Sequence, residues 1–224
     1  MRTTQFVNGQ FYHIFNRGTE KRVIFQDNAD FRRFYESMYL FNDGNFSNPG
    51  GRSSLRDGVP SLRDDTRDPF VQVVSFCLLP NHFHMLLGPL KDGGITEFMY
   101  RLGMGYARYF NKRYERTGRL FEGTFKAVHV ARDAQFLHLP RYIHLNALDL
   151  THYNWREGKI QNWIAAEKFL DQYPWSSHPV YCGQNQQLPI VDRGVMAEIF
   201  PTPDAYRKFL REWSGRYVKS YADG

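Results

Sequence analysis

The feature that most limits the fold is an apolar run that is followed at once by a turn and a second apolar run. Residues 70–79 are almost continuously apolar and include several β-branched side chains, and Pro80-Asn81 follows directly. Residues 82–87 (HFHMLL) form the second run. Short apolar runs bounded by turn residues are typical of buried strands. We therefore expect a buried β-hairpin in this part of the chain.

Two more strands and three helices are predicted around this hairpin. Residues 10–16 alternate and are rich in aromatic side chains, which predicts a strand, and residues 125–130 predict another. The helices are expected to begin at capping side chains and to run from Asp27 to about Phe41, from Thr96 to about Tyr114, and from Asp133 to about Leu148. The order β-α-β-β-α-β, followed by a helix, predicts a ferredoxin-like (RRM-like) α+β fold, with an antiparallel sheet and helices on one face.

The length of 224 residues allows one substantial domain with an extension. We expect residues 1–150 to form the main domain. Residues 151–224 are expected to form a C-terminal extension packed on the same core, with helices near 163–170 and 203–213. Residues 43–68 are crowded with Gly, Pro, Ser, Asp and Arg, which predicts a long flexible surface loop.

Composition narrows the possible environments and partners. The net charge of +6 and the pI of about 9.3 favour an anionic partner. The sequence has two cysteines and no CxxC pair, which argues against a disulfide scaffold and favours a reducing compartment. No apolar stretch approaches the roughly 20 residues that cross a bilayer, and the N-terminus lacks the apolar centre of a secretory signal. We therefore expect a cytoplasmic protein with no membrane partner.

The positive charges are concentrated between Arg101 and Arg132, where only Glu115 and Glu122 oppose them, and aromatic side chains lie between them. Cations can hold phosphates while aromatic rings stack on unpaired bases, so this stretch is a candidate nucleic-acid surface. A solvated helix face above core aromatics explains the pattern equally well. The candidate DNA contacts are Arg17, Arg108, Lys112, Arg116, Arg119 and Lys126.

Two pairs of residues have the spacing of a reactive site. His82 and His84 lie two apart on a predicted strand, so both imidazoles point to one face and can reach one metal ion. HxH pairs also occur in cupin-type sites and by chance. Tyr142 and Asn146 lie four apart on a predicted helix, so hydroxyl and amide are presented together. Asn146 could complete a His, His, Asn ligand set suited to Mg²⁺ or Mn²⁺, whereas plain packing is the alternative for Tyr142.

Several ordered motifs resemble the HUH single-tyrosine transposases. The central one is CLLPNHFHMLL at 77–87. The other motifs are YHIFNRG at 12–18, which resembles the first strand of the family, GRLFEGTFK at 118–126, which resembles the segment entering the fourth strand, and YIHLN at 142–146, which resembles the catalytic helix. WSS at 175–177 resembles a downstream motif of the REP-associated tyrosine transposases, a branch of the insertion-sequence transposase family. The similarity runs from about Phe11 to Trp213, interrupted by residues 43–68.

The resemblance implies a transposase that nicks and rejoins single-stranded DNA containing a hairpin, in a prokaryotic cell and on the nucleoid when it acts. His82 and His84 match the metal-binding pair of the family, and Asn146 matches its third ligand. Tyr142 matches the nucleophile that forms a 5′-phosphotyrosine link. The implied cofactor is Mg²⁺ or Mn²⁺, and the implied state is a monomer or a homodimer. We assign Lys126 the role of the cation that favours the Tyr142 phenolate.

The chain departs from the family in three places. Pro140, two residues before Tyr142, removes a backbone donor and puts the direction of the tyrosine side chain in question. Ala147 stands where the family often has proline. The loop after the first helix is longer than usual.

Two other functions stay open. RNA-binding folds share the β-α-β-β-α-β order and stack bases on aromatic residues of the sheet, so a non-catalytic protein that binds single-stranded nucleic acid is the main alternative. A small-molecule metal enzyme of the cupin type also uses an HxH pair, although the long helices count against it. A covalent protein–oligonucleotide adduct would distinguish the transposase from the binding protein.

Overall fold

The computed structural model describes residues 4–46 and 67–212, and its centre is a four-stranded sheet. The strands are β1 (Tyr12–Arg17), β2 (Val71–Leu79), β3 (His82–Pro89) and β4 (Lys126–His129). Their order across the sheet is β2-β3-β1-β4, and every neighbouring pair is antiparallel. This arrangement confirms the predicted ferredoxin-like α+β class.

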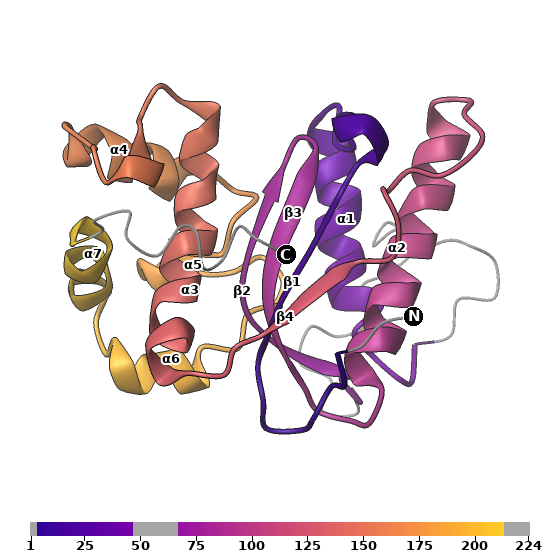
Figure 1. Cartoon of the computed structure of the whole chain (residues 1–224), viewed down its shortest axis with the longest axis horizontal. Helices are drawn as coiled ribbons and strands as arrows, with labels where there is room; N and C mark the ends of the chain where they lie inside the picture. The colour runs from indigo at the N-terminus through magenta and orange to yellow at the C-terminus, as the bar shows by residue number, and fades with distance from the viewer. Residues whose placement is uncertain (1–3, 47–66, 213–224) are drawn as a thin grey trace.

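The predicted hairpin is formed by β2 and β3, which turn at Pro80-Asn81, and Leu79 pairs with His82. Almost every residue in the two strands is buried. Helices α1 (Asn28–Leu40) and α2 (Gly94–Arg113) cover one face of the sheet, and α3 (Asp133–Leu145) covers the other (Figure 1). Because both faces are covered, β2 and β3 carry continuous apolar runs instead of an alternating pattern.

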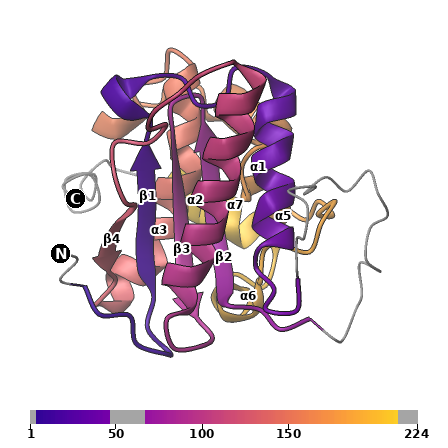
Figure 2. The ribbon, with the colours of Figure 1, turned by 90° about the vertical axis from the view of Figure 1, so that its right-hand side faces the viewer.

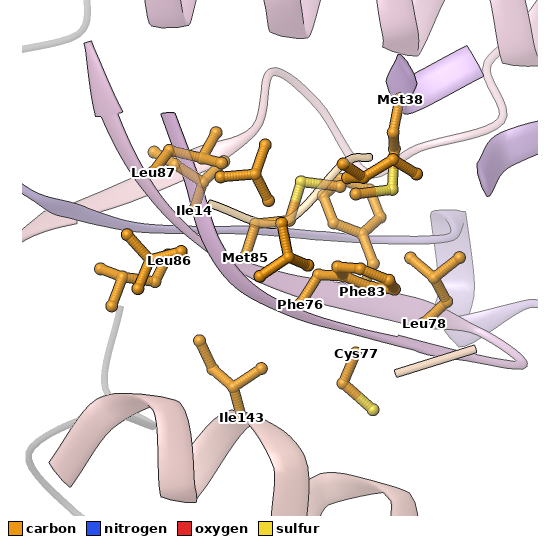
Figure 3. Packing of buried hydrophobic residues seen from close by; sticks show 14 of the residues in the cluster. Ile14, Met38, Phe76, Cys77, Leu78, Phe83, Met85, Leu86, Leu87 and Ile143 are labelled. Atoms are coloured by element: carbon orange, nitrogen blue, oxygen red, sulfur yellow. The ribbon is translucent and has the colours of Figure 1, made fainter. Parts of the chain in front are cut away.

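Side chains on β3 alternate between the two covered faces. Figure 3 shows Phe83 on the same side as Met38 of α1, whereas Leu86 points toward Ile143 of α3. Successive strand residues point to opposite faces, so His84 shares the α3 face with Leu86. The two histidines of the HxH pair therefore lie under the helix that carries the predicted nucleophile.

The helix starts agree with the predictions in one case and correct them in two. Asp27 caps α1, because its side chain accepts hydrogen bonds from the backbone N–H groups of Ala29 and Asp30. Thr96 does not cap α2: the N-cap is Gly93, whose φ of 72° lets the chain turn into the helix without a capping side chain. Asp133 does not cap α3 either, since it is the first residue of that helix and Arg132 is the N-cap.

The end of α3 is also earlier than predicted. The α-helix stops at Leu145, and residues Asn146–Leu150 form the 3-10 helix η3, so only this tighter turn reaches the predicted end at Leu148. Pro140 lies inside α3, and the helix continues through it to Tyr142 and beyond. The proline therefore does not end the helix, although it lacks one backbone donor.

The remaining helices beyond β4 lie on the α3 side of the sheet. Figure 2 looks onto α1 and α2, with the sheet behind them and α3 beyond it. The helices beyond β4 and α3 are η4 (Trp155–Glu157), α4 (Trp163–Gln172), α5 (His178–Tyr181), α6 (Gly194–Ile199) and α7 (Pro203–Arg211). A further short 3-10 helix, η1 (Thr19–Lys21), follows β1. Helices α4 and α7 correspond to the two that were predicted, whereas α5 and α6 were not predicted.

The segment after residue 150 packs on the same core as the sheet. One hydrophobic cluster contains Trp155, Leu170 and Tyr206 together with strand residues such as Ile14 and Leu86. Most of the loop predicted at 43–68, and the end of the helix predicted near 203–213, lie outside the described residues. Among the helices that the structure describes, none has both the length and the apolar character required to cross a membrane.

Candidate active site

A cavity of about 670 Å³ opens on the sheet face that α3 covers. Its walls include His82 and His84 from β3, Tyr142 from α3, Lys126 from β4 and Arg17 at the end of β1. Residues from separate parts of the sequence thus converge at one place. They come together because the strands carry some of them and α3, which lies over that face of the sheet, carries Tyr142.

Both histidines of the HxH pair are held by hydrogen bonds through Nδ1. Nδ1 of His82 lies 2.6 Å from Oδ1 of Asn81. An amide oxygen can only accept, so His82 donates from Nδ1 and its Nε2 carries the lone pair. Nδ1 of His84 lies 2.9 Å from Nε2 of His13, a buried residue on β1. Nε2 of His84 therefore takes no part in the contact with His13.

Burial keeps these imidazoles neutral. Burial, and to a smaller extent the neighbouring Arg17 charge, lower the pKa of His82 to about 4. Burial lowers the pKa of His13 to about 3 and that of His84 well below its usual value. A neutral imidazole with a free lone pair is the form that binds a metal ion. The donor set therefore fits a divalent cation, with oxygen ligands from water or phosphate.

The Tyr142 side chain is only 2% exposed, yet it forms part of the cavity wall. Its ring centroid lies 5.9 Å from that of His84 and 6.0 Å from that of His13, with the rings nearly perpendicular in both pairs. A hydrogen bond also links Tyr142 to Arg156. The phenol therefore lies beside the imidazole pair, and Pro140 does not turn it away.

Asn146 is fully buried and is not among the residues that line the cavity. Its Nδ2 donates to the backbone oxygen of Tyr142 at 2.8 Å, and its Oδ1 accepts from Arg156 at 2.9 Å. To bind a metal in the cavity, this oxygen would have to share or give up the contact with Arg156. The ligand role of Asn146 remains a prediction.

The candidate DNA contacts differ in their surroundings. Arg108, Arg119 and Lys112 are exposed, and the first two line a second groove between α2 and residues 118–125. Lys126 is also exposed, at the cavity. Arg116 donates to Oδ1 of Asn111 at 3.0 Å. The groove and the cavity share Asn16, Gly123 and Thr124 in their linings, so they adjoin each other.

Two residues at the site were not found from the sequence. His13 precedes Phe15 by two positions on β1, so both side chains face the α3 side of the sheet. The period of two places His13 on one face of its strand, but only the pairing of β1 with β3 brings it to His84. Arg156 lies in the short 3-10 helix η4, beyond the motifs that predicted the site, and no spacing pattern marks it.

Asp171, His178 and Cys182 form a separate group, and it is the only cluster of three His, Cys, Asp or Glu side chains with metal-ligand spacing among residues 4–46 and 67–212. Nε2 of His178 lies 3.1 Å from Asp171 and 3.3 Å from the Cys182 sulfur. Arg207 contacts the same carboxylate at 2.9 Å, and burial raises the pKa of the Cys182 thiol to about 12. A guanidinium and a protonated thiol disfavour a cation, so we interpret the group as a structural hydrogen-bond cluster.

Residues 62–146 match the model of a family described as IS200-like transposases. The matched segment contains the HxH strand, the basic helix and Tyr142, and it ends at Asn146. The match confirms the resemblance inferred from the motifs and supports a transposase or DNA-binding role.

A solved structure of a REP-associated tyrosine transposase bound to a REP hairpin is also similar, with 11% identity and a TM-score of 0.46. The similarity covers 86% of this chain and 96% of that one. No curated protein matches the sequence.

Proposed function

From the transposase-like segment at 62–146, we propose that the chain is a single-strand DNA endonuclease and strand transferase with Tyr142 as its nucleophile. The observation that carries this proposal is the cavity in which the Tyr142 side chain meets His82, His84 and Lys126. A phenol can act as the nucleophile, paired imidazoles can hold a metal ion and a cation can neutralise phosphate charge, so the set suits phosphodiester transfer by a tyrosine.

The proposed reaction exchanges one phosphate ester for another. The Tyr142 oxygen forms a bond to phosphorus, and the bond from phosphorus to the 3′ oxygen of the DNA breaks. The phenolic proton passes to solvent, and the departing 3′ oxygen takes a proton from solvent, so that a 5′-phosphotyrosine and a 3′-hydroxyl result. The number of phosphodiester bonds is unchanged, so a 3′-hydroxyl can later reverse the step without a nucleotide cofactor.

The surrounding side chains supply charge and orientation. Lys126 and Arg17 line the cavity and can neutralise non-bridging phosphate oxygens. His82 and His84 would hold Mg²⁺ or Mn²⁺, which supplies Lewis-acid withdrawal of charge from a phosphate oxygen. The buried imidazoles stay neutral and ready to bind because the low pKa of His82, about 4, prevents protonation near neutral pH.

The adjoining groove is the proposed path of the unpaired strand. Tyr100 and Met104 expose 63% and 53% of their surface there. Arg108 and Arg119 line the same groove. Aromatic and apolar surface with flanking cations suits unpaired bases and their phosphates.

The test is formation of a covalent adduct. Purified protein is incubated with Mn²⁺ and a library of labelled hairpin single strands, and adducts that resist denaturing electrophoresis are sequenced. We expect an adduct with the wild type that chelator prevents. Tyr142→Phe should lose the adduct while keeping DNA affinity, because it removes one oxygen and keeps the ring. Tyr153→Phe, which changes a tyrosine outside the cavity, is the control.

Two outcomes would contradict the proposal. DNA binding by the wild type with no adduct on any hairpin would favour the non-catalytic binding protein. An adduct that persists in Tyr142→Phe would assign the nucleophile to another residue.

A further inference from the structure

Arg156 reaches the candidate active site from outside the segment that resembles the transposase family. It lies in η4 (Trp155–Glu157), after the end of the 62–146 match, and its side chain lines the same cavity as Tyr142 and the HxH pair. A separate segment of the chain therefore places a cation beside the predicted nucleophile.

Three neighbours fix the position of the Arg156 guanidinium. Its Nη2 donates to Oδ1 of Asn146 at 2.9 Å and forms an ion pair with Oδ2 of Asp149. Its carbon Cζ lies 4.4 Å from the centroid of the Trp155 ring. The indole Nε1 of Trp155 donates to the other oxygen of Asp149 at 2.6 Å, so the carboxylate holds both side chains.

The same neighbours connect Arg156 to the phenol. The Trp155 and Tyr142 ring centroids lie 5.7 Å apart, and Asn146 holds the backbone oxygen of Tyr142. A hydrogen bond joins Arg156 directly to Tyr142. The guanidinium is thus oriented on one side by Asp149 and contacts the phenol on the other.

We propose that Arg156 is a further catalytic residue, whose guanidinium holds the Tyr142 oxygen in place and stabilises negative charge on that oxygen and on the phosphate it attacks. This inference rests on the proposed function. Arg156 takes no part in making or breaking bonds, so the ester exchange keeps the atom and proton balance given above.

Arg156 is better suited to this role than Lys126, the cation assigned from the sequence. Lys126 lies exposed on β4, and the Arg156 side chain, 36% exposed, is held by Asn146 and Asp149. A charge that its partners already hold in place stabilises developing charge without having to reorganise during the reaction. Burial lowers the pKa of Arg156, but Asp149 and then Tyr142 raise it above its usual value, so the guanidinium remains charged.

The inference also gives a role to Asn146, which is buried and does not line the cavity. Its amide oxygen receives a hydrogen bond from Arg156, and its amide nitrogen holds the Tyr142 backbone. In this geometry Asn146 positions both the cation and the helix end that carries the nucleophile.

The experiment measures single-turnover adduct formation with a hairpin substrate at saturating DNA. Arg156→Ala should slow adduct formation by about 10²–10³-fold, the usual effect of losing one fixed donor to developing charge. Arg156→Lys should be intermediate, because it keeps the charge and loses the planar fork. Lys159→Ala, which removes an exposed cation of the same segment, is the matched control and should react at the wild-type rate.

Chemical rescue separates catalysis from a structural effect. Added guanidinium at low millimolar concentration should restore part of the Arg156→Ala rate and leave the wild type unchanged. A wild-type rate in either Arg156 variant would overturn the inference and leave the proposed function intact. So would an Arg156→Ala defect without rescue in a protein that keeps the wild-type unfolding temperature. Absence of any wild-type adduct would overturn both proposals.

Discussion

Nε2 of His144 lies 2.6 Å from the hydroxyl of Ser177, and this contact ties the helix that carries Tyr142 to the outer edge of the sheet. The Ser177 hydroxyl also accepts from the backbone N–H of Phe76 at 2.8 Å. On its other side, Nδ1 of His144 contacts the Tyr206 hydroxyl at 2.6 Å. A buried hydrogen-bonded chain thus runs from β2 through α3 to α7, and it fixes the helix from the side opposite the cavity.

Ser177→Ala should destabilise the fold. The change leaves the N–H of Phe76 and one nitrogen of the buried His144 without their partner, and each unsatisfied group costs about 1–3 kcal/mol. We expect the free energy of unfolding in urea to fall by about 2–6 kcal/mol in total. Ser37→Ala is the control, because the buried Ser37 hydroxyl has no hydrogen-bond partner among the described residues. An equal loss in the two variants would contradict the linking role of Ser177.

The exposed arginines of the groove should affect DNA binding without affecting stability. Arg108→Ala and Arg119→Ala should each weaken binding of a single-stranded flank. Each should also reduce the slope of log affinity against log salt by about 0.7, the contribution of one phosphate contact on a single strand. Fluorescence anisotropy across a salt series measures both quantities. A flank-free hairpin should be bound almost as tightly by these variants as by the wild type.

Arg113 is a suitable control for the groove arginines because the fold itself engages it. It pairs with Asp27 and with the fully buried Asp30, each at 2.6 Å. Arg113→Ala should lower the free energy of unfolding by about 1–2 kcal/mol, less than for a fully buried pair because the guanidinium is partly exposed. Its salt slope should equal that of the wild type. A reduced slope would place Arg113 on the DNA surface.

Patterns that act over a few residues were predictable from the sequence. The apolar runs around Pro80-Asn81 and the HxH spacing depend only on strand periodicity and turn chemistry, and the hairpin followed from them. The Asp27 cap followed from the same local logic. Thr96 was wrongly chosen because a glycine in the left-handed region can begin a helix without any capping side chain.

Features that depend on register or on short irregular segments were not predictable. The contact of His13 with His84 exists because β1 pairs with β3 so that Phe15 lies opposite His84. No pattern in the sequence sets that register. Arg156 projects from a 3-10 helix of three residues, which is too short to show a periodicity. The position of its side chain is decided by Asp149 and Trp155.

Binding of Mn²⁺ without DNA should depend on the imidazole pair. His82→Ala and His84→Ala should abolish binding detected by electron paramagnetic resonance. His13→Leu should weaken it about 10–100-fold, as expected when the partner that orients a ligand is lost. His152→Ala, at an exposed histidine, should bind as the wild type does. Loss of binding in Cys182→Ser would instead assign the ion to the cluster near α5.

The stability of the metal-free protein should fall in mild acid. The pKa of His13 is about 3 in the folded protein, lowered by burial from a usual value of 6.5. Below pH 6.5 the unfolded chain therefore takes up a proton at His13 that the folded protein does not. Acid thus favours unfolding, and the fold keeps its full stability with respect to His13 only above that pH. One such group costs about 2 kcal/mol on going from pH 6.5 to pH 5.

Urea unfolding in the presence of chelator at pH 7, 6 and 5 measures this dependence. His13→Leu should lower the change in stability between pH 7 and pH 5 by about 2 kcal/mol, whatever its effect at pH 7, because leucine does not titrate. The wild type, measured in the same series, gives the reference slope. A slope in His13→Leu equal to that of the wild type would mean that His13 can be protonated in the folded state, and hence that the contact with His84 does not require a neutral ring.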